Sequence, residues 1–467
     1  MAEKKDAAKK LKEKLLVQRK NAYHLISDKD LKACDKFCEG YKDFMTNAKI
    51  EREVVIYSTD LLKKKGFVEY EHGMKLKAGD KIFVNNRGKA VLAAVIGTAP
   101  ISEGVRLCAA HIDSPRLDLK QNPLYEDTEM ALFKTHYYGG IKKYQWTTIP
   151  LALHGVVIKA DGSTVAVNIG EDENDPVFCV TDLLPHLAAS QMQKPMAKGI
   201  EGERLNIVIG SRPFKEDEES GSVKLNIMNI LFEKYGITEA DFISSELEAV
   251  PAFKAKDIGF DRSMIGAYGH DDKVCAYPAL IATAECKKPK HTVVTVLTDK
   301  EETGSDGNTG LRSAYLKYFI ADIAEALGSD ERTVLSASEC LSADVNAAYD
   351  PTYPEVNERF NSAYVNHGVV ITKYTGARGK AGTSDASAEF TGRIRRLMDA
   401  KKVIWQTGEL GKVDEGGGGT VAAYIANLNV DTIDLGVPVL SMHAPYEIVS
   451  KVDTYMAYKA FEAFMAD

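Results

Sequence analysis

Short apolar runs alternate with helix-like segments over much of this chain. Residues 105–110 and 292–298 are rich in Val, Leu, Ala and Thr, which is typical of buried strands. Residues 28–38, 311–320 and 452–465 show the apolar spacing of helices that pack through one face. Two more strands joined by an Asn-Arg-Gly turn are expected within 81–97. This alternation predicts an α/β domain.

The pattern changes between residues 121 and 256. Short strands separated by Gly and Asp-Gly turns, as in 155–168 and 204–211, predict an all-β region, and 215–222 is expected to be a charged loop. Strands and helices alternate again from 257. We therefore predict a catalytic domain in two parts, 1–120 and 257–467, interrupted by a β-rich insert at 121–256.

A basic amphipathic helix is predicted at the start of the chain. The first 20 residues carry eight Lys or Arg and three Asp or Glu, and Leu11, Leu15 and Leu16 share one helical face. We expect this helix to dock on its own fold or on a neighbouring subunit. Binding to a membrane surface is the alternative.

Composition and charge exclude several classes of protein. Of 467 residues, 45% are hydrophobic and 27% are charged, which is ordinary for a globular protein, and the net charge of -8 gives no reason to expect nucleic-acid binding. Seven cysteines without CxxC spacing argue against a disulfide framework or a cysteine zinc site. No apolar run is long enough to span a membrane and no secretory signal is evident, so a reducing cytoplasm is expected.

Five segments place metal-binding residue types at or near the ends of apolar runs. They carry His111 with Asp113, Asp271 with Asp272, Glu301 with Glu302, Asp344, and His443. Imidazoles and carboxylates suit Zn²⁺ or a similar divalent ion, and strand ends are where open α/β sheets build their sites. The set holds one carboxylate more than the metals need as ligands, and that carboxylate can act as a free base. Metals that activate water and a base that takes its proton are what a hydrolase needs, so the set predicts a two-metal hydrolase.

Each segment also has a structural interpretation when taken alone. His111 and His443 fit core histidines, Asp344 fits a satisfied core acid, and the two acidic pairs fit solvated turns. The hypothesis depends on all five occurring together.

Three neighbouring features have other expected roles. His270 is expected to be structural, and Lys273 is expected to neutralise or orient Asp272. The glycine-rich segment 414–420 lacks the Lys-Ser/Thr ending of a phosphate loop, so we expect a tight loop whose backbone approaches the substrate.

As an ordered set, these motifs resemble those of the aspartyl aminopeptidase and vacuolar-type aminopeptidase I family of co-catalytic zinc metallopeptidases. The similarity rests on Ala110-His111-Ile-Asp113-Ser-Pro, His270-Asp271-Asp272-Lys273, Glu301-Glu302-Thr-Gly, Ser342-Ala-Asp344 and Ser441-Met-His443, and it spans nearly the whole chain. It implies a phosphorylase/hydrolase-like three-layer α/β catalytic domain, an inserted β-rich dimerisation domain, and a tetrahedral dodecamer.

The resemblance also implies roles. His111 and Asp344 would bind one Zn²⁺, Glu302 and His443 would bind a second, and Asp271 would bridge the two. Glu301 would be the general base for a metal-activated water, and Asp113 would orient His111. The implied reaction removes single N-terminal residues from peptides. The ligand types also admit Mn²⁺ or Co²⁺.

Substrate contacts follow less directly from the resemblance. His186 is the candidate for a histidine that a neighbouring subunit contributes to the active site, with a structural histidine as the equal alternative. Arg378 and Lys380 are candidates for reading an acidic N-terminal side chain, while other members of the family prefer neutral residues. The competing functions are a related metal-dependent deacylase or carboxypeptidase, and a non-catalytic scaffold of the same fold.

Overall fold

A nine-stranded sheet forms the centre of the computed structural model, which describes residues 2–467 and their side chains from residue 8 onward. The strand order is β1-β2-β3-β14-β4-β15-β19-β17-β18. The bounds are β1 (Val68–Glu69), β2 (Lys81–Asn86), β3 (Ala90–Val95), β4 (Val105–His111), β14 (Thr292–Thr298), β15 (Glu339–Ser342), β17 (Val369–Thr372), β18 (Trp405–Thr407) and β19 (Asp431–Gly436). The four central strands β14, β4, β15 and β19 are parallel, so their carboxyl ends share one edge.

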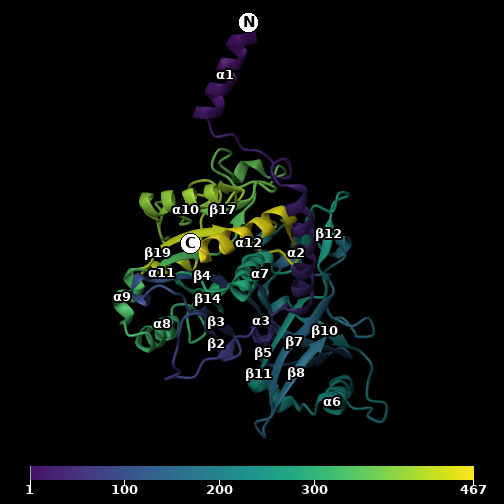
Figure 1. Cartoon of the computed structure of the whole chain (residues 1–467). Helices are drawn as coiled ribbons and strands as arrows, with labels where there is room; N and C mark the ends of the chain where they lie inside the picture. The colour runs from purple at the N-terminus through teal and green to yellow at the C-terminus, as the bar shows by residue number, and fades with distance from the viewer. Residues whose placement is uncertain (1) are drawn as a thin grey trace.

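Helices cover both faces of this sheet and give three layers (Figure 1). One face carries α2 (Asp28–Asn47), α3 (Glu51–Lys64), α7 (His270–Glu285), α10 (Ala388–Ala400) and α12 (Lys451–Met465), and the other carries α8 (Tyr315–Ala326), α9 (Glu331–Ser336) and α11 (Ala422–Ala426). Successive side chains of a strand point to opposite faces. Val293 and Leu297 of β14 accordingly join the first core, and Val294 and Val296 join the second.

A seven-stranded sheet lies beside this domain, in the order β8-β7-β11-β5-β6-β10-β9. Its strands are β5 (Arg116–Asp127), β6 (Met130–Tyr138), β7 (Leu151–Ile158), β8 (Thr164–Ile169), β9 (Cys179–Val180), β10 (Ile207–Gly210) and β11 (Ser245–Pro251). It has its own core around Trp146 and Phe242. A smaller, five-stranded sheet contains β12 (Lys256–Ile258), β13 (Met264–Ala267), β21 (Glu447–Ser450), β20 (Pro438–Leu440) and β16 (Asn346–Ala347).

Two sequence-based expectations about elements were wrong. The region 121–256 is not all-β, because α4 (Ala189–Met192), α5 (Met196–Gly199) and α6 (Ser222–Tyr235) lie within it, and α6 packs Val223 and Ile227 on the sheet. The helix expected from residue 311 begins only at Tyr315, because Arg312 and Ser313 donate backbone hydrogen bonds to Ser305 and Gly310 in a turn.

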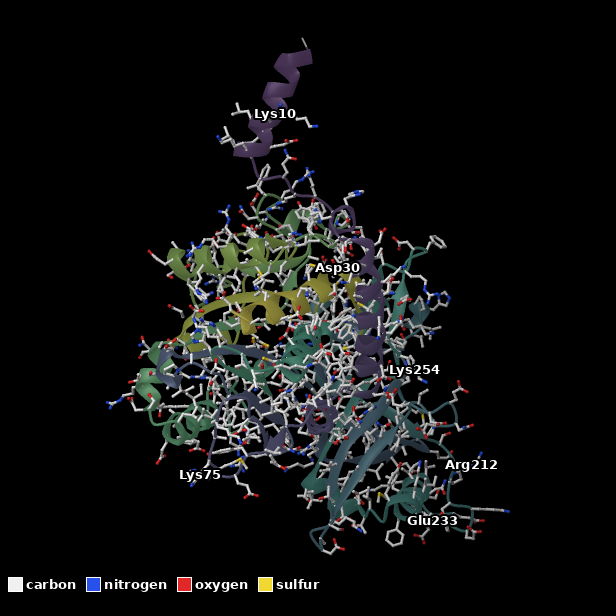
Figure 2. All side chains as sticks on the ribbon, viewed as in Figure 1. Lys10, Asp30, Lys75, Arg212, Glu233 and Lys254 are labelled. Carbon is white, nitrogen blue, oxygen red and sulfur yellow. The ribbon has the colours of Figure 1, made fainter. Side chains whose placement is uncertain are left out.

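The N-terminal helix α1 (Ala2–Leu15) stands away from the body of the molecule (Figure 1). Leu11, Leu15 and Leu16 are 57–66% exposed, so the predicted apolar face does not dock on its own fold. Figure 2 shows Lys10 on this helix at the end of the molecule opposite Arg212 and Glu233. Over the described residues, no helix combines the length and apolarity needed to cross a bilayer.

Candidate metal centre

The predicted ligands meet at the carboxyl edge of the nine-stranded sheet. His111 ends β4, Glu301 and Glu302 lie in a short 3₁₀ turn just after β14, and Asp344 follows β15. These three strands are adjacent and parallel, which explains why segments far apart in sequence converge. Asp271 comes from the start of α7, and His443 from the turn between β20 and β21.

Asp271 lies between the two imidazoles. Its Oδ1 is 3.0 Å from Nε2 of His111, and its Oδ2 is 3.2 Å from Nε2 of His443. Nε2 of His443 is also 3.6 Å from Oε1 of Glu302. A carboxylate that offers one oxygen to each side has the arrangement of a ligand shared by two cations.

Two sets of side chains could each hold a cation. His111, Asp272 and Asp344 place ligand atoms within 4.8 Å of one another, and so do His111, Asp271 and Glu302. All are buried except the half-buried Glu302.

The electrostatics of these acids fit bound cations. Burial and the nearby Asp271 carboxylate raise the pKa of Glu302 well above its usual value, and burial and Asp272 do the same for Asp344. Oε1 of Glu302 is buried and has no hydrogen-bond partner. Crowded buried carboxylates are costly unless cations or protons compensate them, so the donor set suits divalent metal ions.

Glu301 differs from its neighbour Glu302. Burial raises its pKa to about 7, with His111 opposing and the charges of Asp113 and Asp271 adding to the shift. Its Oε2 is 4.0 Å from Nε2 of His111. A carboxylate beside the ligands with a pKa near neutrality has the properties of a general base.

Asp113 contacts both His111 and the turn that carries Glu301 and Glu302. It accepts hydrogen bonds from the backbone N–H groups of Glu301 (3.1 Å) and Glu302 (3.2 Å). Its Oδ1 is also 3.4 Å from Nδ1 of His111. Asp113 therefore faces the ring nitrogen of His111 that points away from Asp271, and it also fixes the turn that carries both glutamates.

Glu447 is a site residue that sequence reasoning missed. It is 1% exposed, and it accepts hydrogen bonds from the backbone N–H groups of Asp271 (3.1 Å) and His443 (2.7 Å). Burial and the nearby Asp271 raise its pKa to about 8. The signal in the sequence was a lone carboxylate beginning an apolar strand, four residues after His443.

The roles expected for the neighbours of Asp271 are only partly met. His270 is buried and hydrogen-bonds the Tyr41 hydroxyl (2.6 Å) and the Ile265 carbonyl (3.1 Å), as expected for a structural histidine. Lys273 does not pair with Asp272, because its ammonium donates to the Lys49 carbonyl and the Ser114 hydroxyl.

A cleft of about 790 Å³ opens beside His443. Its walls include Tyr144, Tyr353, Leu410, Glu415, Gly416, Gly417 and Met442. The glycine-rich segment thus brings its backbone to the cleft, as expected.

Arg378, Lys380 and His186 are not among the residues that line the cleft. Lys380 donates to Asp385 (2.8 Å) and lies 3.8 Å from the centre of the Tyr374 ring, and Arg378 lies in a turn closed by a bridge between Ala377 and Ala381. His186 is exposed in a short 3₁₀ helix (Pro185–Leu187).

Comparison with known proteins gives consistent matches. The family model described as aminopeptidase I zinc metalloprotease (M18) matches residues 44–465. A probable M18 family aminopeptidase 1 of Clostridium acetobutylicum is 52% identical over 459 residues, covering 97% of this chain and 99% of the relative.

Solved structures have the same fold. The M18 aminopeptidase of Thermotoga maritima is 43% identical, with a TM-score of 0.92 over 96% of this chain and 99% of the other. A dodecameric mApe1 of S. cerevisiae is 21% identical, with a TM-score of 0.75 over 93% and 97%, so it bears on the fold alone.

Proposed function

The chain belongs to the aminopeptidase I (M18) family of zinc metalloproteases, and from this premise we propose how its residues divide the work. The protein is a metallo-aminopeptidase, a hydrolase that removes N-terminal residues from peptides. The observation that carries the proposal is the Asp271 carboxylate, which offers one oxygen toward His111 and the other toward His443.

We propose that two Zn²⁺ ions bind per chain, with Mn²⁺ or Co²⁺ as substitutes. His111 and Asp344 would hold one ion, Glu302 and His443 the other, and Asp271 both. Bound ions would supply the positive charge that polarises the scissile carbonyl and acidifies water. The raised pKa values of Glu302 and Asp344 support this assignment, because burial and neighbouring carboxylates outweigh the positive charge of the nearby histidines.

Glu301 is the proposed general base. It would accept a proton from the attacking water and deliver it to the amine of the departing peptide. Its position supports this role, because its Oε2 lies 4.0 Å from Nε2 of the proposed ligand His111 while Glu301 itself is outside the proposed ligand set. Asp113 would keep Glu301 and Glu302 in place through their backbone N–H groups.

We also propose that residues 121–256 are an inserted dimerisation domain between catalytic parts 1–120 and 257–467, in a tetrahedral dodecamer. Exposed apolar side chains on this region, including Leu187 (69%), Met192 (73%) and Phe232 (57%), support its use as an interface. His186 lies on the same stretch, and we propose that it reaches a partner's active site.

The preference of the specificity pocket is a separate proposal. Arg378 and Lys380, which lie outside the cleft lining, are the proposed readers of an acidic N-terminal side chain. The alternative is a preference for neutral residues, which Leu410 and Met442 in the cleft favour. Replacing Arg378 or Lys380 with Ala should slow hydrolysis of Asp- and Glu-substrates selectively. Equal loss with a Leu-substrate would refute the charge-reading role.

A reducing cytoplasm is proposed as the location, in keeping with the free thiols of all seven cysteines.

The deciding experiment is hydrolysis of Asp-, Glu-, Leu-, Lys- and N-acetyl-Leu chromogenic substrates, with metal counted in the same sample. Cleavage of free-amine substrates alone, with about two metals per chain, is expected. Cleavage of N-acetyl-Leu would indicate the deacylase function instead. No cleavage at full metal loading would indicate the scaffold.

A further inference from the structure

Three consecutive residues at the end of β6 contact the metal centre, although β6 belongs to the seven-stranded sheet. The Tyr138 hydroxyl donates to Oδ2 of Asp113 at 2.8 Å. A Cβ on Gly139 would lie 3.1 Å from Oε2 of Glu302, so this glycine leaves room for the glutamate. The Gly140 carbonyl is 2.8 Å from Nδ1 of His443.

The contacts of Tyr138 and Gly140 orient Asp113 and the imidazole of His443. When Nδ1–H of His443 donates to Gly140, the other ring nitrogen, Nε2, is free to face Asp271. The Tyr138 hydroxyl shares Oδ2 of Asp113 with the backbone N–H of Glu302. Tyr138 is therefore one contact away from both glutamates.

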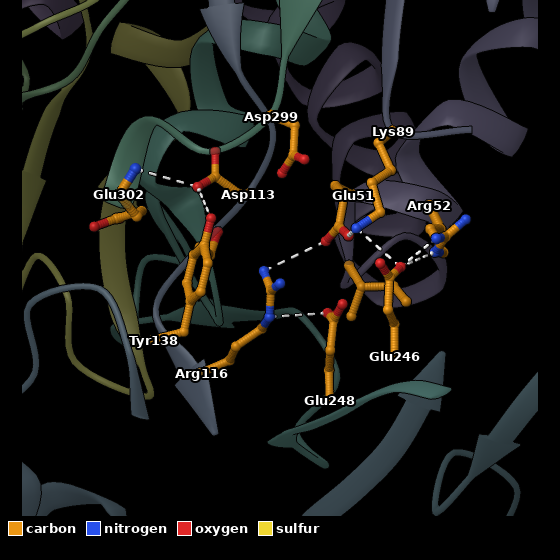
Figure 3. A network of polar contacts seen from close by, with 12 residues as sticks. Glu51, Arg52, Lys89, Asp113, Arg116, Tyr138, Glu246, Glu248, Asp299 and Glu302 are labelled. Carbon is orange, nitrogen blue, oxygen red and sulfur yellow. Dashed lines mark hydrogen bonds and ion pairs between the residues drawn. The ribbon is translucent and has the colours of Figure 1, made fainter. Parts of the chain in front are cut away.

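The Tyr138 ring is itself held in place. The Arg116 guanidinium lies 4.0 Å from the ring centroid. Arg116 is in turn fixed by Glu51 (3.3 Å), Glu248 (3.1 Å) and Asp118 (2.8 Å), and Figure 3 shows this path from α3 through Arg116 and Tyr138 to Asp113. Because Arg116 fixes the ring, the Tyr138 hydroxyl is held toward Asp113.

Tyr138 remains a donor. Burial and the negative charge of Asp113 raise the pKa of its hydroxyl above the ordinary value for tyrosine. Since Asp113 also accepts two backbone N–H groups, the tyrosine O–H completes the set of donors around that carboxylate.

We propose that Tyr138 is a positioning residue for catalysis, through which the seven-stranded sheet sets the orientation of Asp113 and hence of Glu301 and Glu302. This inference rests on the proposed roles of those two glutamates. It assigns to the sheet, besides any part in assembly, a direct part in building the active site.

The first test compares Tyr138→Phe with Tyr137→Phe, a matched control whose side chain is 40% exposed. Loss of a hydrogen bond to a carboxylate should lower kcat about 10- to 100-fold in Tyr138→Phe, with KM changed less than about twofold. Metal content should stay at the wild-type value. The proposal is overturned if the two variants have equal kcat values.

A double-mutant cycle tests the route through Asp113. In an Asp113→Asn background, adding Tyr138→Phe should lower kcat less than about twofold, because the contact is already disrupted. An undiminished effect of Tyr138→Phe in that background would show that the tyrosine acts elsewhere, and would overturn the proposed route.

A second readout does not depend on turnover. The visible absorption of the Co²⁺-substituted protein should change in Tyr138→Phe but not in Tyr137→Phe, since Glu302 is a proposed ligand. Unchanged spectra in both variants would count against positioning of Glu302. A wild-type protein that binds Co²⁺ but cleaves no peptide would refute the proposed function and leave this comparison valid.

If Tyr138→Phe fails to fold, Gly139→Ala provides the test. The added Cβ would lie 3.1 Å from Oε2 of Glu302 and strain a backbone with φ of +73°, so the segment should shift and Co²⁺ titration should show weaker binding of one of the two ions. Wild-type affinity for both ions would overturn the idea that this segment positions Glu302.

Discussion

Neighbouring acids in this protein have different chemistry because they have different surroundings. Glu302 lies 3.6 Å from His443 and has a buried oxygen without a hydrogen-bond partner, whereas Glu301 lies 4.0 Å from Nε2 of His111. In the proposed mechanism, the Glu301–Glu302 turn places one carboxylate among the metal ligands and leaves the other for proton transfer.

Glu301→Gln should therefore retain metal and lose turnover. The amide has nearly the same shape but cannot accept the proton, so kcat should fall at least about 100-fold. Metal content and oligomer size should equal those of the wild type. Activity above a tenth of the wild-type value would reject Glu301 as the base.

Glu447→Ala should weaken metal binding without touching any proposed ligand. It would leave the buried N–H groups of Asp271 and His443 without an acceptor, and loss of such support typically costs 10- to 100-fold in affinity. Competition with a chelator measures the change. Glu218→Ala, in an exposed loop, is the control, and equal affinity in both variants would contradict the supporting role.

At the scale of elements, the parallel strands explain why the site was predictable. Apolar runs that end in ligand-type residues revealed β4, β14 and β15, and parallel pairing brings their ends together. The α6 helix was not anticipated, because its turn-rich surroundings resemble hairpins. The contact of Lys273 with the Lys49 carbonyl was beyond sequence reasoning, since it joins residues 224 positions apart.

The roles of Tyr138 and Glu447 depend on tertiary contacts that the sequence does not reveal. The Tyr-Tyr-Gly-Gly segment looks like an ordinary strand followed by a turn, and only the three-dimensional arrangement places it beside Asp113 and His443. Ligand types can be predicted from residue identity, but the groups that orient ligands are chosen by geometry.

The contact between α3 and β7 should make stability depend on pH. His154 of β7 is buried and lies 2.6 Å from Glu53 of α3 and 3.1 Å from Glu171. Burial alone would lower its pKa, but the hydrogen bonds that its ring donates to Glu171 and Glu53 outweigh burial, and the pKa is raised above 6.5. For Glu53, His154 outweighs burial and lowers the pKa below 4.5.

The directions of these two pKa shifts determine how the free energy of unfolding changes with pH. The contribution of His154 is complete below pH 6.5 and is lost as pH rises through its raised pKa, while that of Glu53 is complete above pH 4.5 and is lost as pH falls. His154→Gln should lose about 3 kcal/mol of unfolding free energy near pH 6, and less at alkaline pH. Urea unfolding across this range, with exposed His24→Gln as control, measures it. A constant deficit at every pH would contradict this account.

At the scale of the whole molecule, metal removal should destabilise the fold. A ligand at 1,000 times its Kd stabilises by about 4 kcal/mol, so chelation should lower Tm clearly. The deficit should grow as pH rises from about 4.5 to about 7, because Glu301 must then ionise without cations nearby. Calorimetry with and without chelator tests this. A deficit that does not depend on pH would argue that the acids are not the cause.

The wide spacing of the ligands along the chain also has a consequence for synthesis. His111 is made well before His443, and the seven-stranded sheet is made in between. Domains tend to fold as units while the ribosome works toward the C-terminus. A nascent chain therefore lacks a proposed metal ligand until His443 has been made, so under the proposed mechanism the order of synthesis itself delays peptide cleavage.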